Sequence, residues 1–330
     1  MYDIQLTNNA FEGANSVYLL GVEGDGPTTL VDTGVALPTI RDELAGHLRE
    51  AGVEFADVER VVLTHWHHDH AGLASEIQAA GDATVYVHEA DAPLVANEPG
   101  AMAAVEATQE RYLEAWAMPE PKREELLAFL ERHDDLRGGR VEVTTLSDGD
   151  HVRAGPYDLE VVHLPGHAAG LAAYTFEREG RREAFVGDAI LPKYTPNVGG
   201  ADVRVDRPLA NYLASLERIQ TLDLDRAWPG HRGPIIAPSA RARDIAVHHE
   251  ERTERVMDAL RERGPATAWE VSDALFGHLE TIHILHGPGE AYAHLDHLVH
   301  EGVVAETDGR YELVDDSRAA SDVLAAGGRR

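Results

Sequence analysis

The chain has 330 residues, of which 43% are hydrophobic, so it is long enough for two domains with apolar cores. It contains no cysteine, which excludes disulfide bonds, a cysteine-ligated zinc site and a thiol nucleophile. The first residues do not form a signal peptide, and no run reaches the length that crosses a bilayer. We therefore expect a cytoplasmic protein that makes no contact with a membrane.

The charge of the chain is strongly unbalanced. Its 58 acidic and 29 basic residues give a formal net charge of −29, and Lys122 and Lys193 are its two lysines. Such a surface repels itself at low salt, whereas the Debye length falls to about 3 Å at 1 M salt. We interpret the chain as halophilic; the alternative is an acidic protein from an ordinary GC-rich organism.

The N-terminal part predicts strands and helices in alternation. Strands are expected at 2–6, 16–22, 28–32, 60–64 and 83–88. Helices are expected at 37–51 and, further along, through about Ala80 to a stop at Gly81. This alternation predicts the layers of an α/β sandwich.

The strand expected at 60–64 leads directly into His65-Trp66-His67-His68-Asp69-His70. Imidazole and carboxylate groups are ligands that suit zinc and similar divalent ions. Because side chains alternate along an extended chain, His65 and His67 can face one ion, while Asp69 and His70 can face a second. Two ions about 3.5–4 Å apart are a known arrangement for hydrolysis, with a hydroxide held between them. The alternative is a polar loop in a chain that has 19 histidines.

Residues 92–136 predict a helical insertion. Helical periodicity covers 102–116 and 121–132, and Pro119 and Pro121 separate the two segments. We expect the insertion to lie over the site as a lid; the alternative is a plain connecting hairpin of helices.

Three later segments place a ligand-type residue just past the end of an apolar strand. These residues are His167 and His231, each after a Pro-Gly turn, and Asp188, after Ala184-Phe185-Val186-Gly187. Strand ends on one rim of a sheet are where open α/β folds place their sites. The loop at 192–207 follows Asp188 and should border the same pocket. Its candidates for binding a substrate anion are Lys193, Tyr194, Arg204 and Arg207, and the alternative is that each pairs with a surface carboxylate.

The pattern changes after Ser239. Helices are expected at 241–263, 266–276 and 292–302, followed by a hairpin of 303–306 and 310–314 around Asp308-Gly309. Three helices and a β-hairpin resemble a winged helix. The tail at 315–330 is rich in Ala and Gly, and we expect it to be flexible.

The ordered ligand residues resemble those of the metallo-β-lactamase fold superfamily over residues 1–240, and Asp32-Thr33-Gly34 resembles its early strand-plus-Asp motif. The resemblance implies an αβ/βα sandwich over residues 1–240. The pattern of helices and hairpin after it predicts a winged-helix domain at 241–315 and a flexible tail at 316–330. The resemblance also implies two divalent metal ions, of which Zn²⁺ is expected and Mn²⁺ or Fe²⁺ are alternatives. The roles it implies are His65, His67 and His167 on the first metal, Asp69, His70 and His231 on the second, Asp188 as the bridge, and Asp32 orienting a ligand.

The remaining histidines have ordinary interpretations. His68 and His163 lie inside the motifs without a ligand position, so they are expected to be structural or to support a ligand, and His88 should end a strand. The others are expected on the surface or in the core: His133, His151, His248, His249 and His278.

Thr64-His65-Trp66-His67 and Gly187-Asp188-Ala189-Ile190-Leu191, followed by a winged helix, resemble the branch of lactamase-β-like hydrolases. That branch includes ribonucleases and thioesterase-like or glyoxalase-II-like enzymes. We expect metal-activated water to be the nucleophile and Asp69 to orient it or to shuttle its proton. The expected substrate is an ester or thioester of a small or carrier-bound acyl group. The alternatives are an endoribonuclease or phosphodiesterase, and a winged-helix regulator that binds nucleic acid.

Charge discriminates between these alternatives. Residues 251–315 contain five arginines, no lysine and 14 acidic residues, a net charge of −9. A recognition helix normally presents a basic face to phosphates, so this count disfavours the regulator and weakens the nuclease. We expect the winged helix to pack or to form a homodimer. The absence of an export signal disfavours an antibiotic substrate, and the C-terminal part departs from glutathione-binding relatives.

Overall fold

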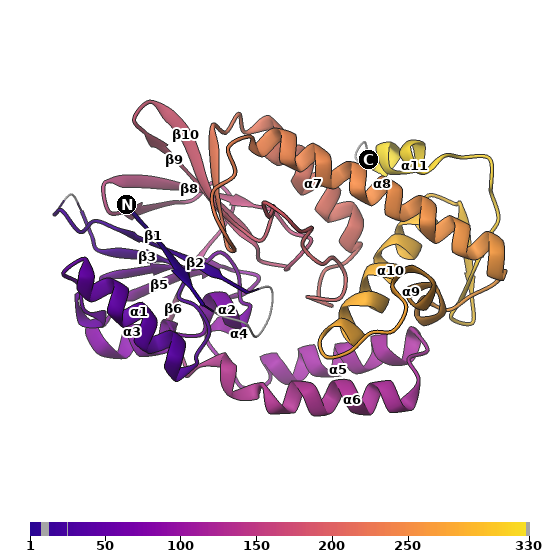
Figure 1. Ribbon diagram of the computed structural model, residues 1–330, viewed down its shortest axis with the longest axis horizontal. Coiled ribbons are helices and arrows are strands. Elements are labelled where there is room, and N and C mark those ends of the chain that lie inside the picture. The colour runs from indigo at the N-terminus through magenta and orange to yellow at the C-terminus, as the bar shows by residue number, and fades with distance from the viewer. Residues whose placement is uncertain (8–12, 25, 328–330) are drawn as a thin grey trace.

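Two β-sheets pack face to face, with helices on both outer sides and a further helical region at one end (Figure 1). This computed structural model describes residues 1–7, 13–24 and 26–327. The α/β sandwich predicted from the sequence is confirmed. Across the described residues, none of the helices combines the length and the apolar composition that a membrane span requires.

The first sheet has six strands in the order β1-β2-β3-β4-β5-β6. They are β1 Tyr2–Leu6, β2 Asn15–Leu20, β3 Thr29–Val31, β4 Arg60–Val62, β5 Thr84–His88 and β6 Val143–Leu146. Strands β1 to β3 are antiparallel, and β3 to β6 run parallel. The helical segments between them are α1 Pro38–Glu50, η1 Phe55–Asp57, α2 His68–Ala71 and α3 Ala74–Gly81.

The second sheet has five strands in the order β11-β10-β9-β8-β7. They are β7 His151–Ala154, β8 Tyr157–His163, β9 Ala172–Arg178, β10 Arg181–Gly187 and β11 Arg226–Pro229. Helices α7 Pro208–Thr221 and α8 Pro238–Arg263 contact one another and cover the outer face of this sheet (Figure 1).

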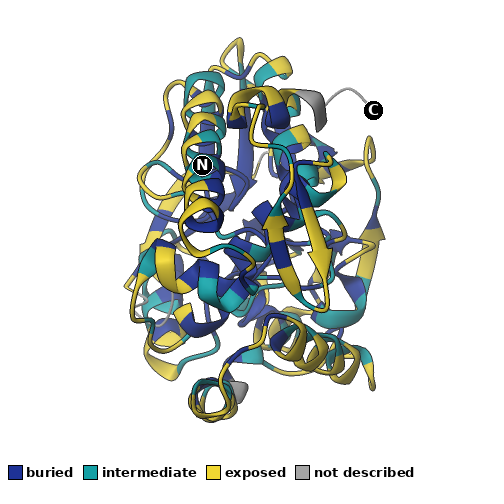
Figure 2. Cartoon of the chain, turned by 90° about the vertical axis from the view of Figure 1, so that its right-hand side faces the viewer, coloured by how far each residue is buried: buried dark blue, intermediate teal, exposed yellow. Residues whose placement is uncertain are grey.

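Alternating side chains build three apolar layers. In β2, Val17 and Leu19 pack with α1 and α3, whereas Tyr18 and Leu20 point into the space between the sheets. Phe185 of β10 meets Tyr18 there, with ring centroids 4.9 Å apart. Both faces of the central strands are therefore buried (Figure 2), which explains why they read as continuous apolar runs.

The helical insertion forms α4 Ala92–Val95, α5 Ala101–Ala115, α6 Glu120–Arg132 and η2 Asp134–Arg137. Helices α5 and α6 lie beside the C-terminal region at the lower edge of Figure 1. Leu113 and Trp116 share an apolar cluster with Leu295 and Leu298. The insertion therefore packs against the C-terminal region and is held by buried apolar area.

The C-terminal region contains α9 Ala268–Phe276, α10 His283–His300, β12 Val304–Thr307, β13 Arg310–Leu313 and α11 Ala320–Gly327. Helix α9 begins with a capping box, in which Thr267 accepts a hydrogen bond from the Glu270 backbone N–H and Glu270 accepts one from that of Thr267. Strands β12 and β13 pair as an antiparallel hairpin. The order of three helices and a hairpin matches the prediction.

Two predictions for this region were wrong. The third helix begins at His283 rather than at 292, and Pro288 lies inside it. Proline lacks an N–H and normally ends a helix, but tertiary packing overrides that preference here. The tail is not frayed over the described residues: α11 buries Val323 completely and contacts α7 and α8. Residues 328–330 lie outside the described residues.

Candidate metal centre

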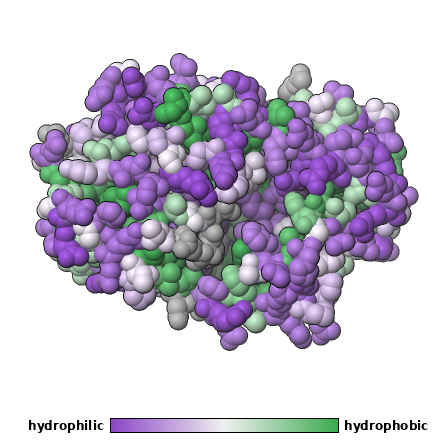
Figure 3. Space-filling view, viewed as in Figure 1, coloured by the Kyte–Doolittle hydropathy of each residue, from purple (hydrophilic) through white to green (hydrophobic). Residues whose placement is uncertain are grey.

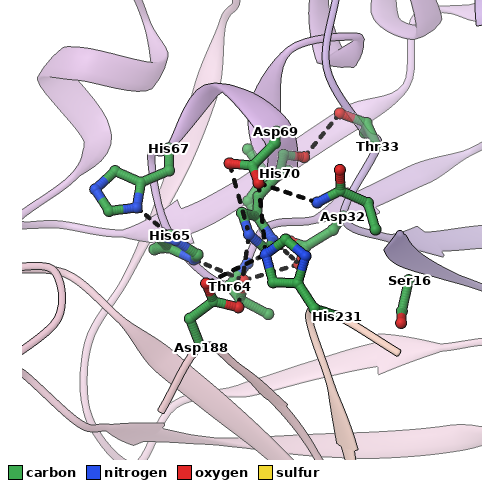
Figure 4. Close-up of polar contacts among 12 residues, drawn as sticks. Ser16, Asp32, Thr33, Thr64, His65, His67, Asp69, His70, Asp188 and His231 are labelled. Atoms are coloured by element: carbon green, nitrogen blue, oxygen red, sulfur yellow. Dashed lines mark hydrogen bonds and ion pairs between the residues drawn. The ribbon is translucent and has the colours of Figure 1, made fainter. Parts of the chain in front are cut away.

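The seven predicted ligands come from four stretches of the chain, at 65–70, 167, 188 and 231, that meet at one rim of the sandwich. Figure 4 labels all of them except His167. His65 and His67 follow β4, and the short helix α2 carries Asp69 and His70. His167, Asp188 and His231 follow β8, β10 and β11. The structure brings all seven together: β8, β10 and β11 run in the same direction and deliver their C-terminal ends to one edge of the second sheet, where the segment after β4 of the first sheet meets them.

The first group of donors contains three imidazoles. His67 Nδ1 lies 3.0 Å from His65 Nε2 and 3.1 Å from His167 Nε2. Two nitrogens on one tetrahedral Zn²⁺ are about 3.3 Å apart when each Zn–N bond is about 2.0–2.1 Å. The spacing of these three atoms therefore suits a single shared cation.

The second group contains Asp69, His70 and His231, and Asp188 lies between the two groups. His231 Nε2 is 3.4 Å from an oxygen of Asp69 and 3.4 Å from Asp188 Oδ2. Asp188 Oδ2 is 3.6 Å from His167 Nε2, and Asp188 Oδ1 is 3.6 Å from His70 Nε2. One carboxylate thus reaches both donor groups, which is the geometry of a bridging ligand.

The outward-facing nitrogens of these imidazoles are already hydrogen-bonded. His167 Nδ1 donates to the Asn197 carbonyl at 2.9 Å, and His67 Nε2 donates to the Ala201 carbonyl at 3.1 Å. His231 Nδ1 donates to the Gly13 carbonyl at 2.9 Å. A carbonyl oxygen only accepts, so each ring keeps its proton outside and turns a lone pair inward, as a metal ligand must.

Asp32 performs the same task for His70. Its carboxylate accepts a hydrogen bond from His70 Nδ1 at 2.9 Å, and it accepts two more from the backbone N–H and the hydroxyl of Thr64. The Thr64 hydroxyl, having donated its proton, accepts from His65 Nδ1 at 3.0 Å. Asp32 therefore orients one ligand directly and a second through Thr64.

Three inward atoms among the described side chains are buried without a hydrogen-bond partner: His70 Nε2, Asp188 Oδ1 and His231 Nε2. Buried polar atoms are rarely left unpaired, because desolvation is costly. A cation bound between the donor groups would satisfy all three. The residues present therefore fit a dinuclear divalent-metal site.

The two donor groups also differ in charge. Burial lowers the pKa of His65 and of His67 well below the usual range, so both stay neutral. Burial also opposes charge on His231, but Asp188 raises the pKa of His231 to about 9. Burial raises the pKa of Asp188, yet His231 and His70 hold it well below its ordinary value. The negative charge of Asp188 that attracts protons to these imidazoles can attract a divalent cation instead.

Position 230 requires glycine, because two metal-binding side chains approach its backbone closely. A Cβ at this position would lie 2.4 Å from Asp188 Oδ1 and 2.5 Å from His70 Cε1. The Pro-Gly turn before His231 therefore also leaves room for the bridging carboxylate.

Some supporting residues were not predicted from the sequence. Asn15 of β2 donates to Asp69 Oδ2 at 3.2 Å, and Asn197 and Ala201 offer only their backbone carbonyls to the imidazoles. Thr64, next to the motif, could have been found as a hydroxyl at a strand end. A backbone carbonyl leaves no signal in side-chain chemistry, so Asn197 and Ala201 could not.

Arg204 is half-buried and pairs with two buried carboxylates. Its Nη2 is 2.6 Å from Asp91 Oδ1 and 2.5 Å from Asp202 Oδ2. Asp91 in turn accepts hydrogen bonds from the backbone N–H groups of Trp66 and Gly170. The guanidinium therefore neutralises carboxylates that hold the backbone beside the metal-binding residues.

The other candidates for substrate binding lie elsewhere. Tyr194 is 45% exposed, and the Lys193 ammonium and the Arg232 guanidinium each lie 5.1 Å from the centre of its ring. Neither Lys193 nor Tyr194 is among the described residues that line the cavity at the metal centre. Arg207 is the N-cap of α7.

A cavity of about 710 Å³ opens above the donor groups. Asp69, His167, Asp188 and His231 lie in its floor. Its apolar walls come from α5, α6, the loop before α7 and the start of α10. The apolar residues that line it there are Met102, Val105, Leu113, Leu127, Phe129, Leu130, Val203, Ile282 and Leu285. The size lies within the range of small-molecule sites.

The remaining histidines have other surroundings. His163 stacks on His88, the last residue of β5, and its Nε2 donates to the Ala169 carbonyl at 2.8 Å. His68 and His133 line the cavity, whereas His249 is fully buried in α8. His163 thus supports the segment that carries His167.

Two parts of the chain match known protein families. Residues 10–231 match the metallo-beta-lactamase superfamily, and residues 253–314 match the metallo-beta-lactamase-like C-terminal domain. The first match covers more than half of the sequence, and the chain belongs to the metallo-beta-lactamase superfamily.

Relatives of this chain match along most of its length. The probable metallo-hydrolase YqjP of Bacillus subtilis is 29% identical over 299 residues, which is 87% of this chain and 88% of YqjP. A metallo-beta-lactamase family protein from Thermus thermophilus is 33% identical, with a TM-score of 0.81, over 94% of this chain and 98% of that one. A beta-lactamase domain protein from Burkholderia ambifaria is 25% identical, with a TM-score of 0.73, over 94% and 91%. The chain is thus a metallo-hydrolase of this superfamily, whose members bind divalent metals.

Proposed function

We propose that the chain hydrolyses an ester or thioester with two divalent cations. One observation carries this proposal: Asp188 joins the two donor groups on the floor of a cavity whose upper walls are apolar. When bound, two such cations lower the pKa of water towards neutrality and polarise a carbonyl oxygen. Zn²⁺ suits the five imidazoles and the carboxylates, with Mn²⁺ or Fe²⁺ as alternatives.

Asp69 is the residue that we propose to orient the attacking water and to accept its proton. Burial raises its pKa, but His70 and His231 lower it below the usual value, so the carboxylate is charged. Asn15 holds Oδ2 of this carboxylate, and the side chain faces the cavity. A fixed, charged carboxylate beside the reacting centre is suited to general base chemistry.

The walls of the cavity favour a neutral, apolar acyl group. Among the described lining residues, Arg137 is the one lysine or arginine, and it pairs with Glu106 at 3.2 Å. Glu110 and Glu131 add negative charge to the lining of the cavity. Beyond the two proposed cations, an RNA backbone would meet acidic side chains and no unpaired lysine or arginine among the described lining residues. This argues for the acyl substrate and against the endoribonuclease.

We propose that the C-terminal region is a winged helix that packs rather than binds nucleic acid. Its helices share an apolar cluster with α5, and Ile282 and Leu285 line the cavity. Its charge of −9 disfavours contact with phosphates. A homodimer remains a prediction for this region, and the nucleic-acid-binding regulator is the disfavoured alternative. The acidic surface supports a halophilic source.

The deciding experiment measures turnover by metal-loaded protein in high salt. The substrates are thioesters and aryl esters with acyl chains of increasing length, and single-stranded RNA. We expect Asp188→Ala to lower acyl hydrolysis by at least about 10³-fold, because the two oxygens of the Asp188 carboxylate reach both donor groups. Asp158→Ala, which changes an exposed carboxylate paired with His151, serves as the matched control and should leave the rate unchanged.

The outcomes separate the candidates. Hydrolysis that rises with acyl length and disappears in Asp188→Ala supports the proposal. RNA cleavage that disappears in the same variant would instead establish the phosphodiesterase. Full acyl hydrolysis in Asp188→Ala would refute the dinuclear mechanism.

A further inference from the structure

We propose that Glu290, on α10 of the C-terminal region, positions two ligands of the first metal, His67 and His167, through the loop 197–201. This inference rests on the metal centre of the proposed function but not on the identity of its substrate. Both imidazoles donate their outward protons to carbonyls of this loop, at Asn197 and at Ala201. The direction of both inward lone pairs therefore depends on where the loop lies.

The loop is a single hydrogen-bonded unit. Asn197 Oδ1 accepts hydrogen bonds from the backbone N–H groups of Gly200 at 3.1 Å and of Ala201 at 2.8 Å. The two carbonyls that meet the imidazoles are therefore linked through one asparagine side chain. A shift of Asn197 would move both of them.

Glu290 anchors this unit from the other side. Its Oε2 accepts hydrogen bonds from Asn197 Nδ2 at 3.0 Å and from the Val198 N–H at 3.1 Å. The residue is 4% exposed. Because a charge-assisted hydrogen bond in a buried place is stronger than an ordinary one, this carboxylate fixes the loop to α10.

The surroundings of Glu290 show how its charge is balanced. His249, Glu290 and His294 offer three donor atoms within 4.8 Å of one another, which resembles a small metal site. However, Arg252 Nη1 lies 3.1 Å from Glu290 Oε1 and already supplies positive charge there. Burial raises the pKa of Glu290, but His294, whose Nε2 lies 3.9 Å from Oε1, and the charge of Arg252 lower it to about 2. We therefore assign this cluster to anchoring the loop rather than to holding a third cation.

Close backbone packing supports the same contact. A Cβ on Gly289 would lie 2.3 Å from the Gly200 Cα and 2.5 Å from its nitrogen, so α10 touches the loop directly. The Asn197 side chain also donates to the His286 carbonyl at 3.1 Å. The stretch 287–289, which is unfavourable for a helix by itself, is therefore the place where the C-terminal region meets the loop.

The test measures metal binding rather than catalysis. Metal-free protein is titrated with Zn²⁺ against a competing chelator, and with Co²⁺ by absorption, for the wild type, Glu290→Ala, Glu290→Gln and Asn197→Ala. Loss of groups that orient ligands typically weakens metal binding by about 10–100-fold. We expect this loss in one of the two dissociation constants, with a changed Co²⁺ spectrum, for Glu290→Ala and Asn197→Ala. Glu290→Gln, which keeps an oxygen for the loop, should lose less.

The matched control is Glu301→Gln, at the C-terminus of the same helix, where Glu301 is 3.6 Å from Arg318 and 8% exposed at its side chain. It should keep both dissociation constants. If Glu290→Ala folds and binds both metals like the wild type, the proposal is wrong. If Glu290→Ala does not fold, Asn197→Ala decides in the same way, since it removes the loop's side of the same contact and leaves the Glu290–Arg252 ion pair inside the C-terminal region in place. A wild type that binds no metal would refute the proposed function instead.

Discussion

At the scale of single residues, Asp32 shows how one buried side chain sets a metal ligand. Its backbone has a φ of 58°, in the left-handed region that Asp and Asn tolerate better than other side chains, and its carboxylate meets Thr64 and His70. We predict that Asp32→Asn lowers the affinity for the second metal by about 10–100-fold. The amide oxygen can still accept from Thr64, but the amide nitrogen would face the Nδ1 proton of His70 and favour the wrong tautomer. Chelator competition measures this loss.

Asp82→Asn is the matched control for this prediction. Asp82 also has a positive φ, of 56°, but it is exposed at the end of α3, beside the start of β5 and away from the ligands. It should keep wild-type affinity. Equal affinities for the two variants would show that Asp32 does not set the tautomer of His70.

At the scale of elements, the contact between α8 and α10 buries a neutral histidine. His249 of α8 faces Tyr212 of α7, faces Glu290 and His294 of α10, and neighbours His248 and Arg252 on its own helix. Burial lowers its pKa to about 3. The unfolded chain takes up a proton near pH 6.5 and the folded chain does not. Stability is therefore lost as the pH falls from 6.5 towards 3.

This predicts a smaller acid sensitivity in His249→Leu. Below pH 6.5, His249 should contribute a slope of up to about 1.4 kcal/mol per pH unit to the unfolding free energy. Urea unfolding of metal-free wild type and variant between pH 7 and 4 measures the difference in slope. Parallel curves would mean that His249 is charged in the folded protein.

At the scale of the whole molecule, the net charge of −29 acts over the entire surface. The face in Figure 3 is mostly hydrophilic, with small apolar patches. Repulsion between like charges weakens as salt shortens the Debye length. We predict that KCl raised from 0.1 to 2 M increases Tm by several degrees, at about 2–4 °C for each kcal/mol of relieved repulsion. Sucrose at matched osmolality, which does not screen charge, is the control.

A Tm that is unchanged or falls in KCl would contradict the halophilic interpretation. An increase of the same size in sucrose would also count against it, because exclusion from the protein surface would then explain the effect.

The sequence by itself predicted the sandwich and the residues that meet at its rim. The short apolar strands, and the position of His65, Asp188 and His231 directly after three of them, depend on backbone direction over a few residues. Only the tertiary structure decided that Arg204 pairs with Asp91, that α10 continues through Pro288, and that Glu290 holds Asn197. Those contacts join segments that are far apart in the chain, and packing between whole elements sets them, which local spacing does not encode.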